Sequence, residues 1–370
     1  MINFDFMPSR PIARYTMRLF VTRTLAVLVS LTLILMTLDL LGESGKILAV
    51  PGNDQPQLWH YVVLRMPELI SRFLPFSALL GTLIVFAGLN QHSEIVAMKA
   101  AGISAHQILS PLILASIVLG VLTFAFNEIV VVHSARALNA WSDADYHAVP
   151  AETDIMSNAW VLDGSNLVRA RHVGGSGRQL HLERVTIYQR DRGTLQRVVD
   201  IARADQLPGG GAAQGWLLKG LTSYDAVQGV VSHSDRAIGL KGIDPLRFTL
   251  AKVDPTELDY GQLKRSIAEL EAAGRQTDEA RAGLWHKLAA PASTVLMPLL
   301  AAVAAFGLAR SGQVLMRATI GMALGFGYFV IDNFSLAMGN VGIYPPFLAA
   351  WAPVFLFFLI GETVLIRSEE

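Results

Sequence analysis

The 370-residue sequence contains no cysteine, and only 16% of its residues are charged. Without cysteine the chain can form neither disulfides nor thiolate metal sites. Its nine histidines include no His-Glu-x-x-His spacing, and no Gly-x-Ser-x-Gly motif occurs, so neither a zinc protease nor an α/β-type serine hydrolase is indicated. We therefore predict no catalytic residue and no metal ligand in this chain.

A phosphate-binding loop is missing as well. Residues 42–46 read Gly-Glu-Ser-Gly-Lys, but the four residues that separate the two glycines of such a loop are absent. Ile47 also stands where the loop needs a Ser or Thr. Because no nucleotide site is indicated, the energy for any active transport must come from a partner protein or an ion gradient.

Hydrophobic residues, in contrast, make up 52% of the sequence and are gathered in blocks. A helix needs about 20 consecutive apolar residues to cross the roughly 30 Å hydrocarbon core of a bilayer. Six stretches approach or exceed that length: 19–41, 73–89, 108–126, 288–308, 318–338 and 347–366. The sequence thus predicts a membrane α-helical bundle of six transmembrane helices.

The first stretch follows Arg10, Arg14 and Arg18, a basic arm that a signal peptide would also have. The stretch is too long for a signal peptide, and no small-x-small cleavage site follows promptly. We interpret it as a retained transmembrane helix.

Lysine and arginine in the short loops predict the orientation. Arg310 and Arg317 lie between the fourth and fifth stretches, and Arg367 follows the sixth. The opposite loops are poorer in basic residues, since 42–58 holds one lysine and 339–344 holds no charge. Both termini are therefore predicted to be cytoplasmic.

The long segment between the third and fourth stretches is then predicted to lie outside, in a periplasm. Its apolar residues alternate with polar ones, which is typical of strands. The alternation is seen at Leu180 and Leu182, at Val199 and Ile201, and at Leu246, Phe248 and Leu250. Gly-rich breaks at 174–177 and 209–211 separate these runs. We predict an inserted all-β domain, an antiparallel sandwich or jellyroll of short strands.

Helical spacing returns after this domain. Asp254 is a candidate N-cap for a connecting helix that ends at Gly274, and a second helix start at Thr277 leads into the fourth apolar stretch. The predicted organisation is transmembrane helices one to three in residues 1–131, the periplasmic domain with its connecting helix in 132–281, and helices four to six in 282–370.

A short helix is predicted near 93–102, between the second and third stretches. Ser93 can cap it, and Glu94 lies in the first turn, where the helix dipole favours an anion. Such a helix either reverses the chain at the membrane surface or acts as a coupling helix. In the second case Glu94 would anchor it in a groove of a cytoplasmic ATPase, with Ile95 and Met98 as buried contacts.

Taken in order, these features resemble the LptF/LptG family, the permeases of the lipopolysaccharide-export ABC transporter. The resemblance covers nearly the whole chain, and within the family it is greater to the LptG branch than to the LptF branch. It is carried by 93–102, by the large outer domain, and by 284–346. Within the last segment, the matching residues are Trp285, Lys287, Gly325, Phe326, Asp332, Tyr344, Pro345 and Pro346.

The resemblance implies an assembly in the bacterial inner membrane. Its expected partners are an LptF-like permease, an LptB-like ATPase dimer that uses ATP and Mg²⁺, an LptC-like single-helix protein and an LptA-like periplasmic bridge protein. Lipopolysaccharide and membrane lipids are the expected ligands, and nucleic acid is not. No cofactor is expected on this chain itself.

In the family, helices one and five line a central lipid cavity. Gly321 and Gly325 form a small-xxx-small face on helix five, which suits either a gate between subunits or tight packing inside one subunit. Asp332 interrupts the same apolar span at a cost of a few kcal/mol, so we expect a structural hydrogen bond or a role in the cavity. Asp39 in helix one either faces the cavity or is hydrated near the interface.

Some family members place basic residues at the outer end of helix one, where they can meet lipid phosphates. This chain has Glu43 there, and Lys46 is the nearest cation. The headgroup would then lie against Lys46, or against Arg65 and Arg72 before helix two, unless the partner supplies the charge. Arg65 and Arg72 are equally explained as interfacial anchors.

We therefore predict a permease subunit that extracts lipopolysaccharide from the inner membrane and passes it to a periplasmic bridge toward the outer membrane. The alternative is a membrane-anchored scaffold or assembly factor whose periplasmic domain binds proteins. A scaffold would need neither six crossings nor an intramembrane carboxylate, so the permease is favoured.

Overall fold

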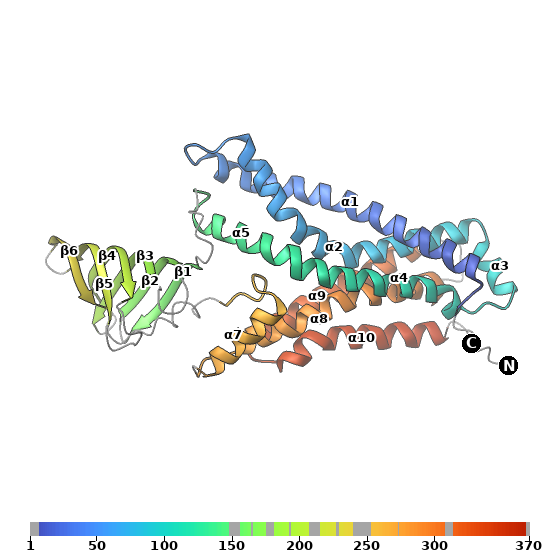
Figure 1. The fold of residues 1–370 in the computed structure, drawn as a ribbon. Helices are drawn as coiled ribbons and strands as arrows, with labels where there is room; N and C mark the ends of the chain where they lie inside the picture. The colour runs from blue at the N-terminus through green and yellow to red at the C-terminus, as the bar shows by residue number, and fades with distance from the viewer. Residues whose placement is uncertain are drawn as a thin grey trace. The chain divides into compact units, whose positions relative to one another are not determined.

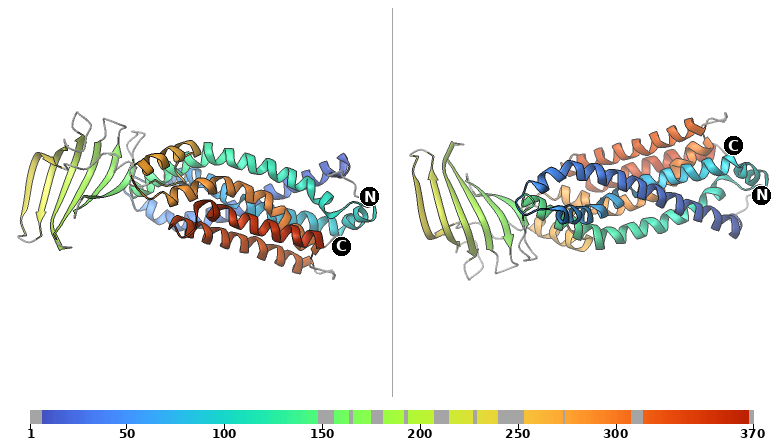
Figure 2. Two further views of the ribbon diagram at one scale, coloured as in Figure 1. Left: turned by 90° about the horizontal axis from the view of Figure 1, so that it is seen from below. Right: turned by 90° about the horizontal axis from the view of Figure 1, so that it is seen from above.

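The computed structural model describes residues 7–147, 156–163, 166–174, 181–191, 194–206, 215–226, 229–239, 253–272, 274–307 and 314–367. The chain forms two compact units. The helical unit comprises Met1–Gly45, Asn53–Arg136 and Pro255–Glu370, and the β unit comprises Lys46–Gly52 and Ala137–Asp254. Figures 1 and 2 draw the long helices of the first and the single sheet of the second.

Six helices in the described ranges are long and apolar enough to cross a membrane, which confirms the predicted spans. The first two are α1 (Arg10–Leu48) and α2 (Gln55–Gln91), and the third runs through α4 (Ala105–Phe126), the π-helical turn η1 (Asn127–Val131) and α5 (Val132–Asp143). The fourth is α8 (Asp278–Ala302), continued by the π-helical turn η2 (Val303–Gly307), and the last two are α9 (Val314–Asn340) and α10 (Pro346–Arg367). The predicted domain boundaries after residues 131 and 281 stay predictions.

The first two helices are longer than a bilayer requires. At 1.5 Å per residue, the 39 residues of α1 measure roughly 58 Å, about twice the hydrocarbon thickness. With 37 residues, α2 is nearly as long. Both helices must therefore tilt strongly or extend into water.

The centre of the helical unit is α8. It packs against α2, α4, α9 and α10, and 72% of the residues in its most apolar stretch are buried. Prolines 291 and 298 lie inside it, and neighbouring helices that pack this closely make such breaks in a helix tolerable. The core of the unit is built around this helix.

In contrast, α1 touches the bundle along one narrow stripe. From residue 16 to residue 36 its buried residues are spaced four apart, which places them on one face: Thr16, Phe20, Thr24, Leu28, Thr32 and Met36. Only 17% of its most apolar stretch is buried, and for α9 the share is 22%. These two spans are the least buried of the six.

The predicted connecting helix is present as α7 (Tyr260–Ala272), but it begins six residues after the predicted cap. The predicted N-cap, Asp254, lies before a turn that spans residues 255–258. Asp259 caps the helix instead: its Oδ1 accepts from the Gln262 amide at 2.7 Å, and its own amide donates to Gln262 Oε1 at 3.3 Å. This reciprocal pair is a stronger start signal than the Asp254 pattern.

The β unit holds one six-stranded antiparallel sheet in the order β1-β2-β3-β4-β5-β6. The strands are β1 (Met156–Asp163), β2 (Asn166–Gly174), β3 (His181–Asp191), β4 (Thr194–Gln206), β5 (Trp216–Asp225) and β6 (Val231–Gly239). The inserted antiparallel β domain is thereby confirmed. A jellyroll is not confirmed, because each described strand pairs with its sequence neighbour in one sheet. The strand predicted at 246–250 lies outside the described residues.

A crease crosses the middle of the sheet. The pairing skips Arg184 in β3, Ala202 in β4 and Gly220 in β5. Arg184 and Gly220 have φ values of 49° and 64°, which reverses the alternation of side chains.

At this line the buried positions switch between even and odd residue numbers, while they stay on the same side of the sheet. In β3 they are Leu182 before it and Val185 after it, and in β4 they are Ile201 before it and Ala204 after it. All four belong to one apolar cluster around Trp216, so both halves of the sheet contribute to the same core.

Ion pairs follow the crease on the polar side. Asp205 accepts hydrogen bonds from Lys219 at 2.6 Å and from Arg203 at 2.7 Å, and Arg203 also lies 3.4 Å from Glu183. Partial burial opposes ionisation of Asp205, but the hydrogen bonds and charges of Lys219 and Arg203 outweigh it and lower the pKa of this carboxyl. Asp205 therefore stabilises the sheet as a carboxylate.

Candidate functional site

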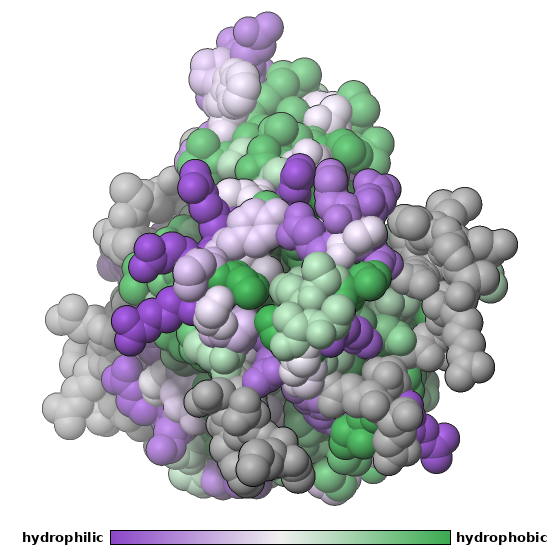
Figure 3. Space-filling view, turned by 90° about the vertical axis from the view of Figure 1, so that its right-hand side faces the viewer, coloured by the Kyte–Doolittle hydropathy of each residue, from purple (hydrophilic) through white to green (hydrophobic). Residues whose placement is uncertain are grey.

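The predicted short helix is present as α3 (Glu94–Ala100), at the end of the helical unit that also holds both termini (Figure 1). Its cap differs from the prediction, because Ser93 has a left-handed backbone and makes no side-chain cap. Seen from this end, hydrophilic side chains cover much of the surface, with hydrophobic ones between them (Figure 3). Such a mixed surface suits a membrane interface or a protein contact.

The side chains of α3 divide between the bundle and the surface. Ile95 is only 6% exposed and belongs to the helical core, against which Met98 also packs. Glu94 accepts a hydrogen bond from Tyr15 Oη of α1 at 3.3 Å, while Val96 is exposed. Ile95 and Met98 thus anchor α3 to this chain, and Val96 lies on its exposed face.

Near the other end of α1, two predicted site residues meet. Asp39 accepts from Tyr61 Oη at 2.6 Å and from Arg65 Nε at 3.2 Å, and Arg65 also pairs with Glu68 at 2.5 Å. Arg65 is thus bound by two carboxylates. Arg72, in contrast, is about half exposed, and its nearest approach to Glu68 is 4.0 Å, which is too long for a hydrogen bond. Lys46 is exposed on the β unit. Of the two arginines, Arg72 is the more available to an anion.

The two glycines of α9 pack against α2 of the same chain. A Cβ on Gly321 would lie 2.8 Å from Leu83 Cδ2, and one on Gly325 would lie 2.2 Å from Leu79 Cδ2. A side chain at either position would therefore require Leu83 or Leu79 to move. The close helix approach that the small-xxx-small pattern indicates is therefore made within this chain.

Asp332 of α9 contacts α8. Its Oδ2 lies 3.2 Å from His286 Nε2, and its side chain is 14% exposed. The other carboxylate oxygen, Oδ1, is buried with no hydrogen-bond partner among the described residues. Leaving such an oxygen unpaired costs about 1–3 kcal/mol, so this carboxyl does not simply maximise stability.

The exposed face of α9 is apolar and aromatic. Phe326, Val330 and Phe334 are spaced four apart, and each is about half exposed or more. On α1, Val29, Leu33 and Leu41 form a similar exposed stripe. Two apolar helix faces thus have no covering element among the described parts of the chain.

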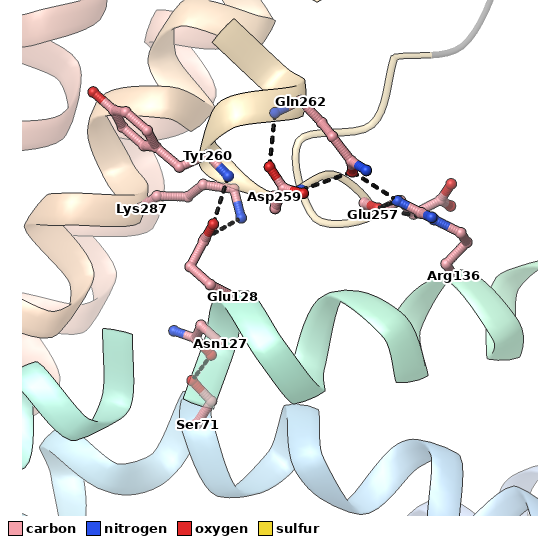
Figure 4. Close-up of polar contacts among 9 residues, drawn as sticks. All are labelled: Ser71, Asn127, Glu128, Arg136, Glu257, Asp259, Tyr260, Gln262 and Lys287. Carbon is pink, nitrogen blue, oxygen red and sulfur yellow. Dashed lines mark hydrogen bonds and ion pairs between the residues drawn. The ribbon is translucent and has the colours of Figure 1, made fainter. Parts of the chain in front are cut away.

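A polar junction that the sequence did not predict joins four elements (Figure 4). Glu128 of η1 binds Lys287 of α8 at 3.1 Å and the backbone amide of Tyr260, the first residue of α7. Next to it, Asn127 accepts a hydrogen bond from Ser71 of α2. A glutamate just past an apolar run and a lysine just before one are the signal that could have found this pair.

The same close-up shows a second contact further along α5 (Figure 4). Arg136 donates to the Glu257 carbonyl oxygen at 2.8 Å and to Gln262 Oε1 at 3.0 Å. Glu257 belongs to the turn before α7, and Gln262 lies in the first turn of α7. Glu128 and Arg136 therefore hold the start of α7 at two points.

None of these clusters has the arrangement of an enzyme site. In the described ranges, no three His, Asp or Glu side chains come together as metal ligands would. The polar contacts join helices to one another, and the apolar faces of α1 and α9 point away from the core. This arrangement fits a membrane protein that works through helix movement and lipid or protein contacts.

Comparisons with known proteins agree with this architecture. The family model described as lipopolysaccharide export system permease LptF/LptG matches residues 14–367. The lipopolysaccharide export system permease protein LptG of Escherichia coli K12 is 28% identical over 350 residues, which cover 93% of this chain and 94% of the relative. LptG of Haemophilus influenzae is 24% identical over 332 residues, which cover 86% and 89%.

The matched region includes the inserted β unit, five spans in full and the first span from residue 14 onward. The chain is thus a multi-pass inner-membrane protein and a permease component, which is the non-catalytic part of such a transporter. It belongs to the LptF/LptG family of lipopolysaccharide export system permeases.

Proposed function

We propose that this chain extracts lipopolysaccharide from the inner membrane and passes it to a periplasmic bridge protein, driven by a separate ATPase. The observation that carries the proposal is the exposure of α1 and α9. Both are apolar enough to span the membrane, yet 17% and 22% of their most apolar stretches are buried. Two such faces on one permease can line a lipid path together with a second permease.

The orientation follows from the number of spans. With six crossings, both termini and α3 lie on one side of the membrane. The chain leaves the third span for the β unit, and returns to the fourth span, on the other side. The basic N-terminal arm makes the first side cytoplasmic and places the β unit in the periplasm. The partners are an LptF-like permease, an LptB-like ATPase dimer that binds ATP and Mg²⁺, an LptC-like protein and an LptA-like bridge.

The coupling element in this proposal is α3. Its exposed residues, with Glu94 at the rim, contact the ATPase, while Ile95 and Met98 connect α3 to the core. Movement of the ATPase then displaces α3 and the α2–α4 hairpin together. Glu94→Ala should reduce co-purification of the ATPase about tenfold and leave membrane insertion unchanged. Wild-type recovery of the ATPase with this variant would remove Glu94 from the contact.

The lipid path in this proposal runs between α1 and α9. Close packing of Gly321 and Gly325 on α2 sets the position of α9, and so presents its aromatic face to the lipid. Asp39 and Asp332 hold α1 and α9 on their neighbours. Of the two arginines, Arg72 contacts the headgroup phosphates, whereas Arg65 mainly orients Asp39. Lys46, which belongs to the β unit, is a separate candidate for such a contact.

Affinity purification tests the assembly. The tagged chain is extracted from its native membrane in mild detergent, and mass spectrometry identifies the co-purifying proteins and lipids. We expect an ABC-type ATPase, a second six-span permease and lipopolysaccharide. If these are absent under conditions that keep a known ABC transporter intact, the scaffold interpretation replaces the permease.

A transport assay tests the activity. Inside-out membrane vesicles that contain the assembly are given ATP and a soluble acceptor in the lumen, and lipopolysaccharide bound to the acceptor is measured. We expect transfer that depends on ATP and on this chain. Equal transfer from vesicles without the chain would refute the proposed function.

A further inference from the structure

The pair of Glu128 and Lys287 is one of the best-shielded ion pairs of the helical unit. Their side chains are 16% and 13% exposed, and the Glu128 Oε1 to Lys287 Nζ distance is 3.1 Å. The ion pair of Arg281 with Glu271, in contrast, has side chains that are about half exposed. A shielded pair keeps its geometry, because water and salt screen it less.

The backbone around Glu128 is specialised. Residues Asn127–Val131 form a π-helical turn between α4 and α5, and such turns are frequent at functional positions. Asn127 contacts Ser71 of α2, and its neighbour Glu128 reaches α8 and α7. The turn thus directs two consecutive side chains to three different helices.

Both carboxylate oxygens of Glu128 are in use. Oε1 binds Lys287, and Oε2 accepts the amide hydrogen of Tyr260, which starts α7. The first amides of a helix have no partner within the helix and carry partial positive charge, so a carboxylate is well matched to this position. Glu128 therefore fixes α7 on α8 by bonds to both.

This junction lies where the chain leaves for the β unit and where it returns. In sequence, α5 precedes the first described strand, and the turn before α7 comes after the last described strand. Arg136 of α5 holds that turn through Glu257 and Gln262, across 121 and 126 residues of chain. The outgoing and returning segments are thereby tied to each other and, through Glu128, to the fourth span.

We propose that Glu128 is a positioning residue that transmits movement of the third and fourth spans to α7, and so couples ATP hydrolysis to lipid release through the β unit. The inference rests on the proposed export function. Without the Glu128 contacts the spans can still move and the ATPase can still turn over. The contacts that pass this movement to α7, the segment returning from the β unit, are then lost.

The test measures coupling rather than activity alone. Glu128→Gln and Lys287→Met are each built into the complete transporter, and lipopolysaccharide transferred per ATP hydrolysed is determined in vesicles. We expect a decrease of about tenfold in this ratio, within the usual range of coupling energies, at an unchanged rate of ATP hydrolysis. Lys287→Arg keeps the charge and should keep the ratio.

A matched control removes another link between the same two helices. Arg281 of α8 pairs with Glu271 of α7 at the surface. Arg281→Gln should leave the ratio unchanged, because an exposed pair holds its helices weakly. Hydrogen exchange at the start of α7 should become faster in Glu128→Gln and not in this control.

The outcomes separate this inference from the proposed function. If the wild-type chain shows no ATP-dependent transfer, the export function fails. If the wild-type chain transfers lipid and Glu128→Gln keeps the wild-type ratio, the positioning role fails.

A second variant covers a folding failure. If Glu128→Gln does not accumulate, the exchanged pair Glu128→Lys with Lys287→Glu is measured instead. This variant should accumulate, because the ion pair is restored, and should still lose coupling, because an ammonium group cannot accept the Tyr260 amide hydrogen. A wild-type ratio in the exchanged variant would overturn the proposal.

Discussion

The spans α1 and α8 are both apolar enough to cross a membrane, yet they have opposite surroundings. In α8, 72% of the most apolar stretch is buried among four neighbouring helices, whereas in α1 the share is 17%. The apolar side chains of α8 pack against other helices of the same chain, whereas most of those of α1 face lipid or another subunit. The comparison shows that hydropathy identifies a span, while burial shows which spans have a face left for function.

Truncation in each helix should separate these two roles most strongly. Leu300 of α8 is fully buried, so Leu300→Ala should cost about 2–5 kcal/mol of stability. Leu33 of α1 is 57% exposed, so Leu33→Ala should change the stability of the isolated chain by less than about 0.5 kcal/mol. Unfolding in detergent, followed by circular dichroism, measures both. Equal losses would mean that α1 is packed as firmly as α8.

The crossing of α1 on α2 gives the next largest effect. A Cβ on Gly81 would lie 2.9 Å from the backbone N and Cα of Thr24, and a backbone cannot move aside as a side chain can. Gly81→Ala should therefore cost about 1–3 kcal/mol.

The control for this variant is Gly88→Ala in the same helix. Nothing lies within 4 Å of the added methyl group there, so this change should be neutral or stabilise by up to about 1 kcal/mol. Thermal unfolding of the two variants in detergent decides. A neutral Gly81→Ala would mean that α1 is not seated against α2.

The exposed face of α9 should respond in transport and not in stability. Phe334 is 57% exposed, so Phe334→Ala should change the unfolding free energy of the purified chain by less than about 0.5 kcal/mol. Lipid transfer in vesicles should fall several-fold, because an aromatic contact to lipid or to the second permease is lost. Unchanged transfer would make this face an ordinary lipid-facing surface.

The β unit should show the smallest effect, through pH. The pKa of Asp205 is lowered in the folded chain, so its ion pairs stabilise the sheet above about pH 3.8 and this contribution is lost as the pH falls below that value. The partners are partly exposed, so Asp205→Asn should remove about 1 kcal/mol or less at neutral pH. Urea unfolding at pH 6 and at pH 3 should differ less for the variant than for the wild type.

The bilayer explains why the spans were predictable from the sequence. An apolar run of about 20 residues is most stable as a helix across the hydrocarbon core, so the six stretches identified the six helices. The alternation at Val199 and Ile201 likewise predicted a strand, and both residues are buried. These patterns depend on neighbours in the sequence, which is why they can be read without a structure.

Features that depend on distant residues were not predictable. The partners Glu128 and Lys287 are 159 residues apart, and Asp39 and Arg65 meet only because α1 and α2 fold back on each other. The alternation of buried and exposed residues reverses at Arg184, a residue type that gives no signal for a left-handed backbone. The pattern of Gly321 and Gly325 indicated close packing, but not which helix would supply the contact.

The order of the strands has a consequence for synthesis. Each described strand pairs with the strand before it in the sequence, so every contact in the ladder is local. The sheet can therefore be assembled hairpin by hairpin as the segment emerges across the membrane, before the fourth span is made. The sheet, which lies in sequence between two membrane spans, therefore needs no pairing between strands that are distant in the chain. The contacts of Arg136 and Glu128 with the start of α7 form last, because α7 and α8 are synthesised after the sheet.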